Sequence, residues 1–147
     1  HTFRTVPSAG ARHAFETFLF INKVNSMDKG LYYFNALEHK LNQVCLDESM
    51  GNAIYKGCFK QSMVKNAAVV FIWICDIARM TWRYSHRGYR YVFIDVGHVC
   101  QNLYLCAEAI NIGVCAIAAF DDDVMNNLLN LDGQNQFTIY LATVGKL

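Results

Sequence analysis

Two short segments of the chain carry residues that could take part in chemistry. One is a turn before an apolar stretch, in which small residues leave backbone amides open to a ligand and an arginine could meet an anion. Its residues are Pro7, Ser8, Ala9, Gly10, Ala11 and Arg12. The other is Arg83-Tyr84, where a phenol among several cations could exchange a proton with a substrate. Each also has a purely structural interpretation, because turn residues serve turns and arginines coat helices.

Two further segments have weaker signals. Residues 113–120 contain Ile117, Ala118 and Ala119, and the small side chains there would leave backbone N–H groups open to a flat ligand. Close packing of a sheet on a helix explains them equally well. Asp121-Asp122-Asp123 could hold a hard cation, but acidic residues are also favoured in the first turn of a helix, and no second carboxylate cluster accompanies them. We therefore predict no metal site.

Composition restricts the class of protein. The 147 residues are 54% hydrophobic, which indicates one globular domain, and 13 Lys and Arg against 12 Asp and Glu argue against nucleic acid as a partner. The longest apolar run, residues 67–75, is too short to span a membrane, for which about 20 residues are needed. Six cysteines without a Cys-x-x-Cys pair are typical of reduced, packed thiols, and we expect a cytoplasmic protein.

The pattern of apolar residues predicts the order of the elements. Apolar and β-branched runs predict strands at 15–21, 31–34, 40–44, 67–75, 114–118 and 137–144. Helices are expected within 47–65, from Ile77 with Asp76 as its cap, over 90–111, and from Asp121 to Leu129. This order predicts an α+β fold with a mainly antiparallel sheet flanked by helices.

Two features of the predicted helices bear on function. Arg79, Arg83 and Arg87 recur every four residues, which would place three guanidinium groups on one helical face. The helix over 90–111 is apolar on nearly every side and must therefore be buried all round. In a chain of this size, the sheet can cover one side and a second subunit the other, so we predict a homodimer.

Several short motifs, in their order along the chain, carry a resemblance to a known family. They are Trp82-Arg83-Tyr84, Arg87-Gly88-Tyr89-Arg90-Tyr91, Gly97-His98, Gln101-Asn102-Leu103, Phe120-Asp121-Asp122, Leu131-Asp132 and Val144-Gly145-Lys146. Together they resemble the nitroreductase-like superfamily of FMN-dependent oxidoreductases, and most closely its SagB-type dehydrogenase branch. The match is specific over 82–132, and the 7–10 turn followed by Gly30-Leu31-Tyr32 extends it over nearly the whole chain.

The resemblance implies a nitroreductase-like fold that dimerises through long central helices and binds FMN at the dimer interface. Hydride would pass from NADH or NADPH through the flavin to a small acceptor, nitroaromatic or quinone-like. The turn with Pro7, Ser8, Ala9, Gly10 and Arg12 would lie along the flavin, and the backbone of Ile117, Ala118 and Ala119 would face its N5 edge. Lys146 would lie by the ribityl phosphate, and Tyr84 with Arg83 would serve the substrate.

Two departures from the family pattern leave alternatives open. The family opens with helices whose arginine-rich motif grips the flavin phosphate, so we expect residues 1–147 to form a single nitroreductase-like domain without those helices. Azoline-oxidising members have Lys-Tyr where this chain has Arg83-Tyr84, and arginine stays protonated and cannot act as a base. The alternatives are a SagB-type azoline dehydrogenase acting on a modified peptide, and a flavin-free binding or structural dimer.

Overall fold

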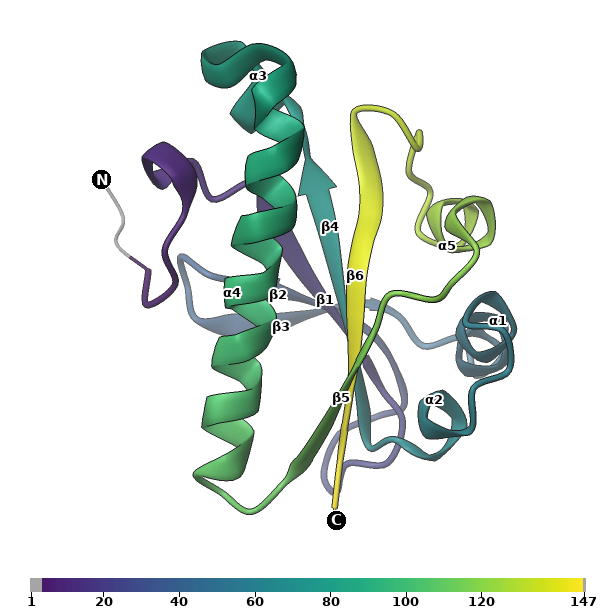
Figure 1. The fold of residues 1–147 in the computed structure, drawn as a ribbon. Helices are drawn as coiled ribbons and strands as arrows, with labels where there is room; N and C mark the ends of the chain where they lie inside the picture. Colours follow the sequence, from purple (N-terminus) through teal and green to yellow (C-terminus); the bar gives the residue numbers. More distant parts are fainter. Residues whose placement is uncertain (1–3, 147) are drawn as a thin grey trace.

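A six-stranded sheet forms the centre of the computed structural model, which describes residues 4–146 (Figure 1). The strands are β1 (Phe15–Ile21), β2 (Gly30–Asn35), β3 (Lys40–Cys45), β4 (Val69–Asp76), β5 (Gly113–Ile117) and β6 (Gln136–Gly145). They lie in the order β3-β2-β1-β4-β6-β5, and every neighbouring pair is antiparallel. The predicted α+β class and mainly antiparallel sheet are therefore confirmed.

Helices cover both faces of the sheet, with α4 on one side and α1, α2 and α5 on the other (Figure 1). The helices are α1 (Met50–Gly57), α2 (Ser62–Asn66), α3 (Ala78–Tyr84), α4 (Gly88–Glu108) and α5 (Asp122–Leu128), with single 3-10 turns η1 (Ala9–Ala11) and η2 (Ser85–Arg87). Each face has its own core. Ile54, Ile72 and Leu141 are buried on the α1 side, and Trp73 and Val96 on the α4 side.

The central position of β4 explains why its sequence is an unbroken apolar run. It pairs with β1 on one edge and β6 on the other, and helices cover both of its faces. Alternation of polar and apolar residues is lost when both faces of a strand are buried. Ile72 and Cys75 are fully buried, and burial of a side chain such as Ile72 contributes about 1.5–3 kcal/mol.

The predicted arginine face does not form. Asp76 ends β4 rather than capping a helix, and its carboxylate lies 3.2 Å from the guanidinium of Arg79, which also binds Glu16 at 2.6 Å. Helix α3 then stops at Tyr84, because Ser85 takes a left-handed φ of 49° that no α-helix can continue through. Since this break turns the chain before Arg87, the four-residue spacing no longer gives one face.

Helix α4 is buried on one side only within the single chain. Val92, Val96 and Cys100 recur every four residues and pack on the sheet. On the outer side, Phe93 is 62% exposed and Leu105 61%. The expectation that the sheet covers one side of this helix is confirmed, and the covering of the outer side by a second subunit stays a prediction.

Two local predictions are confirmed. Asp121 is the N-cap of α5, where its carboxylate accepts a hydrogen bond from the N–H of Val124 at 3.0 Å. All six cysteines are free thiols.

Within residues 4–146, none of the helices is both long enough and apolar enough to cross a membrane.

Candidate functional site

The turn at residues 8–12 is fixed by hydrogen bonds to its own chain and to α4. The N–H of His13 donates to Ser8 Oγ at 3.0 Å, which closes the turn. The N–H of Ala9 donates to both carboxylate oxygens of Asp95, at 3.0 and 3.3 Å. Asp95 is 6% exposed and lies among apolar residues of α4. This buried carboxylate therefore holds the turn in place.

The same turn packs against the end of α3. Gly10 has a φ of +58°, and a Cβ there would come within 2.3 Å of Tyr84 Oη, so both backbone conformation and space require glycine. The Tyr84 ring packs edge-on against Tyr91, with centroids 4.9 Å apart, and the Arg83 guanidinium lies 5.5 Å from the Tyr84 ring. The predicted catalytic pair is thus in contact with the predicted flavin-binding turn.

Arginines surround this contact. Arg12 Nε donates to the carbonyl of Gly10 at 2.8 Å, and its guanidinium lies 5.2 Å from the exposed ring of Trp82. Burial lowers the pKa of His13, and the charges of Arg4 and Arg12 lower it further, against the opposing charge of Asp95. At neutral pH the positive charge around the turn therefore comes from Arg4 and Arg12 rather than from His13.

The second predicted group lies where β5 ends. Ile117 is buried, whereas Ala118 and Ala119 are exposed. Gln61 Nε2 donates to the carbonyl of Ala119 at 2.8 Å and to that of Cys58 at 2.9 Å, which pins the segment to the loop after α1. Small side chains on a fixed, exposed backbone leave room for a flat ligand.

The structure does not bring these two groups together within one chain. The turn precedes β1 and the second group follows β5, and β4 and β6 lie between these strands. Three strand spacings amount to about 14 Å. The two segments also lie on opposite sides of α4 (Figure 1). Within one chain, the two segments therefore do not form adjoining walls of one site.

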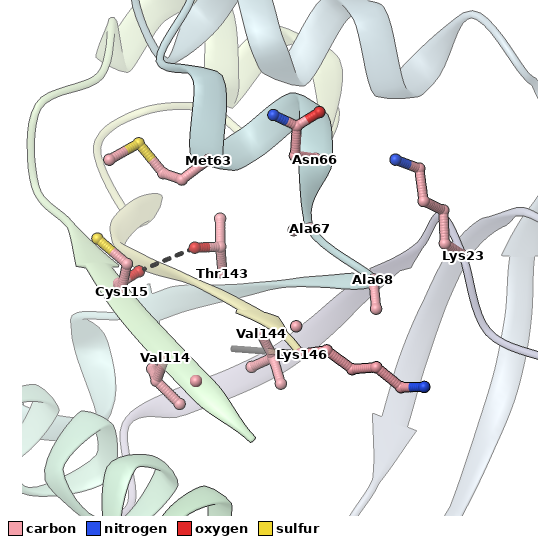
Figure 2. Close-up of a pocket in the computed structure, with 12 residues that line it drawn as sticks. Lys23, Met63, Asn66, Ala67, Ala68, Val114, Cys115, Thr143, Val144 and Lys146 are labelled. Carbon is pink, nitrogen blue, oxygen red and sulfur yellow. Dashed lines mark hydrogen bonds between the residues drawn. The ribbon is translucent and has the colours of Figure 1, made fainter. Parts of the chain in front are cut away.

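Lys146 lies away from both groups, at the rim of a pocket of about 560 Å³ (Figure 2). The pocket is bounded by the start of β5, the end of β6 and the segment from α2 to β4, with Gly113, Cys115 and Met63 among its walls. Its charged residues are Lys23 and Lys146, and none of the described residues that line it carries a carboxylate. This set of donors fits a phosphate monoester, which makes the pocket compatible with FMN.

A second cavity, of about 360 Å³, adjoins the turn at Pro7 and Ser8. Phe15, Phe34 and Val99 supply its apolar walls, and Arg4, His13, His39 and Glu16 its charged or titratable groups. Both Glu16 oxygens already have partners, Arg79 at 2.6 Å and the Tyr33 hydroxyl at 2.7 Å. Because that carboxylate already has partners, the phenylalanine walls decide what the cavity suits, which is a small aromatic molecule.

Sequence reasoning missed three residues of these sites: Asp95, Gln61 and Lys23. A lone acid within the apolar positions of a long helix was a signal for Asp95, since a carboxylate is rarely buried without a partner. Gln61 and Lys23 lie in polar connecting segments, and the sequence had no feature that set them apart.

Comparison with known proteins identifies the family of the chain. The model of the nitroreductase family matches residues 1–146. The relative named "Putative nitroreductase MJ1384", from Methanocaldococcus jannaschii, is 33% identical over 98% of this chain and 71% of its own length. These matches bear out the resemblance found in the sequence motifs.

Two solved structures share the fold. One is the Escherichia coli microcin synthetase McbBCD complex with truncated pro-MccB17 bound, with a TM-score of 0.84 at 20% identity over all of this chain and 57% of that one. The other is the NADPH:FMN oxidoreductase of Vibrio harveyi complexed with NAD+, with a TM-score of 0.68 at 16% identity over 97% and 54%. At such identities the likeness shows the fold alone, and this chain spans little more than half of either.

The expectation of an oxidoreductase is confirmed at the level of the family, and the suspected SagB-type branch is consistent with a second relative. That relative, the trifolitoxin-processing protein TfxB of Rhizobium leguminosarum bv. trifolii, is 26% identical over 90% of this chain and 36% of its own length. The family model, the MJ1384 match and the shared architecture lead to one conclusion: the chain belongs to the nitroreductase family.

Proposed function

We propose that the protein is an FMN-dependent oxidoreductase that passes hydride from NADH or NADPH to a small aromatic acceptor. The observation that carries this proposal is the lysine-rimmed, carboxylate-free pocket beside β5, in a chain of the nitroreductase family. The Vibrio harveyi enzyme of the same fold is an NADPH:FMN oxidoreductase, which supports flavin and nicotinamide as the cofactor pair. Bound FMN would supply the hydride-transfer chemistry.

The residues of the chain would orient the flavin and shield it from water. The backbone of Ala118 and Ala119, held by Gln61, would present neutral hydrogen-bonding groups to the ring without blocking the path of a hydride. Lys146 would bind the phosphate. Pro7, Ser8, Ala9 and Gly10 would cover the ring, and Arg12 would add positive charge at its edge.

A homodimer would complete this site. One subunit would contribute the end of β5 and Lys146, and the turn of a second subunit would cover the same flavin, since the two segments do not adjoin within one chain. The outer face of α4 supports such pairing, because Phe93, Ile94 and Leu105 are each at least half exposed. A Cβ added at Gly97, between them, would meet nothing within 4 Å. A glycine in mid-helix facing open space suits the close approach of a second helix.

Arg83 and Tyr84 would act on the substrate. Arg83 is permanently charged, so it would attract an anionic group of the acceptor, and the Tyr84 phenol could donate a proton to the reduced product. The cavity beside the turn, with its phenylalanine walls, would admit one aromatic ring.

The visible absorption spectrum of the purified full-length protein tests the proposal. We expect flavin bands that persist after FMN is added and excess is removed by gel filtration, and bleaching of those bands under anaerobic NADH or NADPH. Protein that remains colourless would favour the flavin-free binding dimer instead.

A peptide-modifying activity is the second candidate, because the chain shares its fold over its full length with a microcin synthetase structure that contains a bound precursor peptide. If the protein is a SagB-type azoline dehydrogenase, the reaction needs a base at the position of Arg83. Arg83→Lys in flavin-loaded protein should then raise oxidation of a thiazoline-containing peptide that the protein binds. No gain would leave the small acceptor as the better substrate class.

A further inference from the structure

We propose that Lys23 is a second phosphate-binding side chain, which together with Lys146 forms a two-lysine clamp for the phosphate of FMN. This inference rests on the proposed function and extends it to a residue in the β1–β2 connection. The proposal rests on one observation: both lysines line the same pocket, and Ala68 lies between them (Figure 2).

Backbone hydrogen bonds tie the two lysines to the same residue. The N–H groups of Asn22 and Lys23 both donate to the carbonyl of Ala68, at 2.9 and 3.0 Å. The N–H of Ala68 in turn donates to the carbonyl of Val144 at 2.9 Å, two residues before Lys146. The Asn22 side chain adds a bond from Nδ2 to the carbonyl of Ala67 at 2.8 Å. Since both lysines extend from fixed backbone, only their side chains need to be ordered when an anion binds.

The charge around the pocket favours a dianion. Within residues 4–146, neither Lys23 nor Lys146 forms an ion pair, and the residues that line the pocket include no aspartate or glutamate. Figure 2 shows the two ammonium groups pointing away from each other, so both side chains would turn toward an anion that binds between them. A phosphate monoester carries a charge of about −1.5 to −2 at pH 7 and has three acceptor oxygens, enough for both lysines.

Strand β5 connects the pocket to the proposed ring site, which suits a ligand with its charge at one end. Strand β5 runs from Gly113, on the pocket wall, to Ile117, and Ala118 and Ala119 follow at once. Five residues of a strand span about 16 Å. In FMN the ring and the phosphate stand at opposite ends of a ribityl chain, so a ring at Ala118 and a phosphate near the lysines lie along one strand.

The test compares FMN with riboflavin, which has the same ring and ribityl chain but no phosphate. Binding of each to the full-length protein is measured by flavin fluorescence. Lys23→Ala should weaken FMN binding about ten- to hundred-fold, as loss of one charge-assisted hydrogen bond predicts, and should leave riboflavin binding unchanged. Lys23→Arg should keep most of the affinity for FMN. Lys56→Ala, which removes an exposed lysine of α1 away from the pocket, should change neither.

Four results would overturn the assignment. Unchanged FMN binding in Lys23→Ala, or an equal loss for FMN and riboflavin, would remove Lys23 from the phosphate site while leaving the flavin proposal intact. Wild-type protein that binds FMN no better than riboflavin would exclude a phosphate site as a whole. Wild-type protein that binds neither flavin would reject the proposed function together with the inference. Urea unfolding midpoints equal to wild type would show that each variant is folded.

Discussion

The N–H of Ala9 bonds to both carboxylate oxygens of Asp95, and this contact ties the turn that precedes the sheet to the middle of α4. Among residues 4–146 the Asp95 carboxylate forms no ion pair with a guanidinium or ammonium group, and burying an unpaired carboxylate is costly. Here the Asp95 carboxylate fixes the turn at residues 8–12, which is otherwise held by local hydrogen bonds such as that from His13 N–H to Ser8 Oγ. Because α4 also presents the exposed apolar face, one helix positions the turn and offers the surface for a second subunit.

Replacing Asp95 should destabilise the protein according to whether an acceptor remains. Asp95→Leu would remove the acceptor of the half-buried Ala9 N–H, and loss of a hydrogen bond to a charged group costs about 1.5–3 kcal/mol in the free energy of unfolding. Asp95→Asn keeps an acceptor and should lose less than half of that. Urea unfolding followed by circular dichroism measures both, with Glu108→Leu at an exposed position of the same helix as control. Equal losses for the two Asp95 variants would contradict the role of the hydrogen bond.

Gly10 and Tyr84 should be coupled in a double-mutant cycle. Gly10→Ala would bring a Cβ within 2.3 Å of Tyr84 Oη, and the left-handed φ of +58° adds backbone strain of about 1–2 kcal/mol. In a Tyr84→Phe background the hydroxyl is gone, and the nearest atom is the ring carbon at 3.3 Å. The Gly10→Ala penalty should therefore shrink to the backbone strain alone. Additive losses in the free energy of unfolding would show that the contact does not limit this position.

Gly97 should control the oligomeric state. We expect the wild-type protein to sediment as a dimer, and Gly97→Leu to shift it toward monomer, because the added side chain would separate two closely packed helices. If the helix face is instead solvated, replacing this glycine should only raise helix stability, by about 0.5–1 kcal/mol. Leu37→Glu, at an 80% exposed site on the β2–β3 connection, is the control. A wild-type monomer at micromolar concentration would reject the dimer.

The strands were predictable from the sequence because apolar runs and turn residues determine them locally. The predicted strand 15–21 matches β1 at both ends, and the order of elements was enough for the fold class. The arginine face failed for a tertiary reason: Ser85 adopts a left-handed φ, and Arg79 is drawn to Glu16 on the neighbouring strand. A spacing rule cannot include partners that are 63 residues away.

Only part of the candidate site was predictable from the sequence, because some of its residues act through contacts between distant elements. The small residues of the turn and of 117–119 stand out by type, whereas Asp95, Gln61 and Lys23 act through contacts between elements distant in sequence. Lys23 shares a pocket with Lys146 only because β4 and β6 bring Ala68 and Val144 together. Residue type alone gives no indication of such proximity.

The cysteines should differ sharply in reactivity. Burial raises the pKa of the Cys58 thiol to about 11 and that of Cys75 to about 12, so almost no thiolate is present at pH 8. Cys106 is exposed on α4. Iodoacetamide at pH 8, followed by mass spectrometry of tryptic peptides, should label Cys106 and leave Cys58 and Cys75 unmodified until urea is added. Labelling of Cys75 in the folded protein would contradict the burial of this core.

The His13 imidazole should make stability depend on pH. Burial and the charges of Arg4 and Arg12 lower its pKa below the ordinary 6.5, so the folded state prefers the neutral ring. The unfolded chain binds the proton first as pH falls, and the stability that is fully present above pH 6.5 should decline from there to the lower pKa of the folded state. His13→Asn removes the titration and tolerates the left-handed φ of 47° at this position.

As pH falls from 8 to 5, the urea midpoint of the wild-type protein should therefore decrease more than that of His13→Asn. Proton-detected NMR of the imidazole gives the pKa directly, and two charge changes should move it in opposite directions. Arg4→Gln should raise the pKa of His13 by removing a repelling charge, and Asp95→Asn should lower it further by removing an attracting one. If both substitutions moved the pKa the same way, the charges around the turn could not be what sets it.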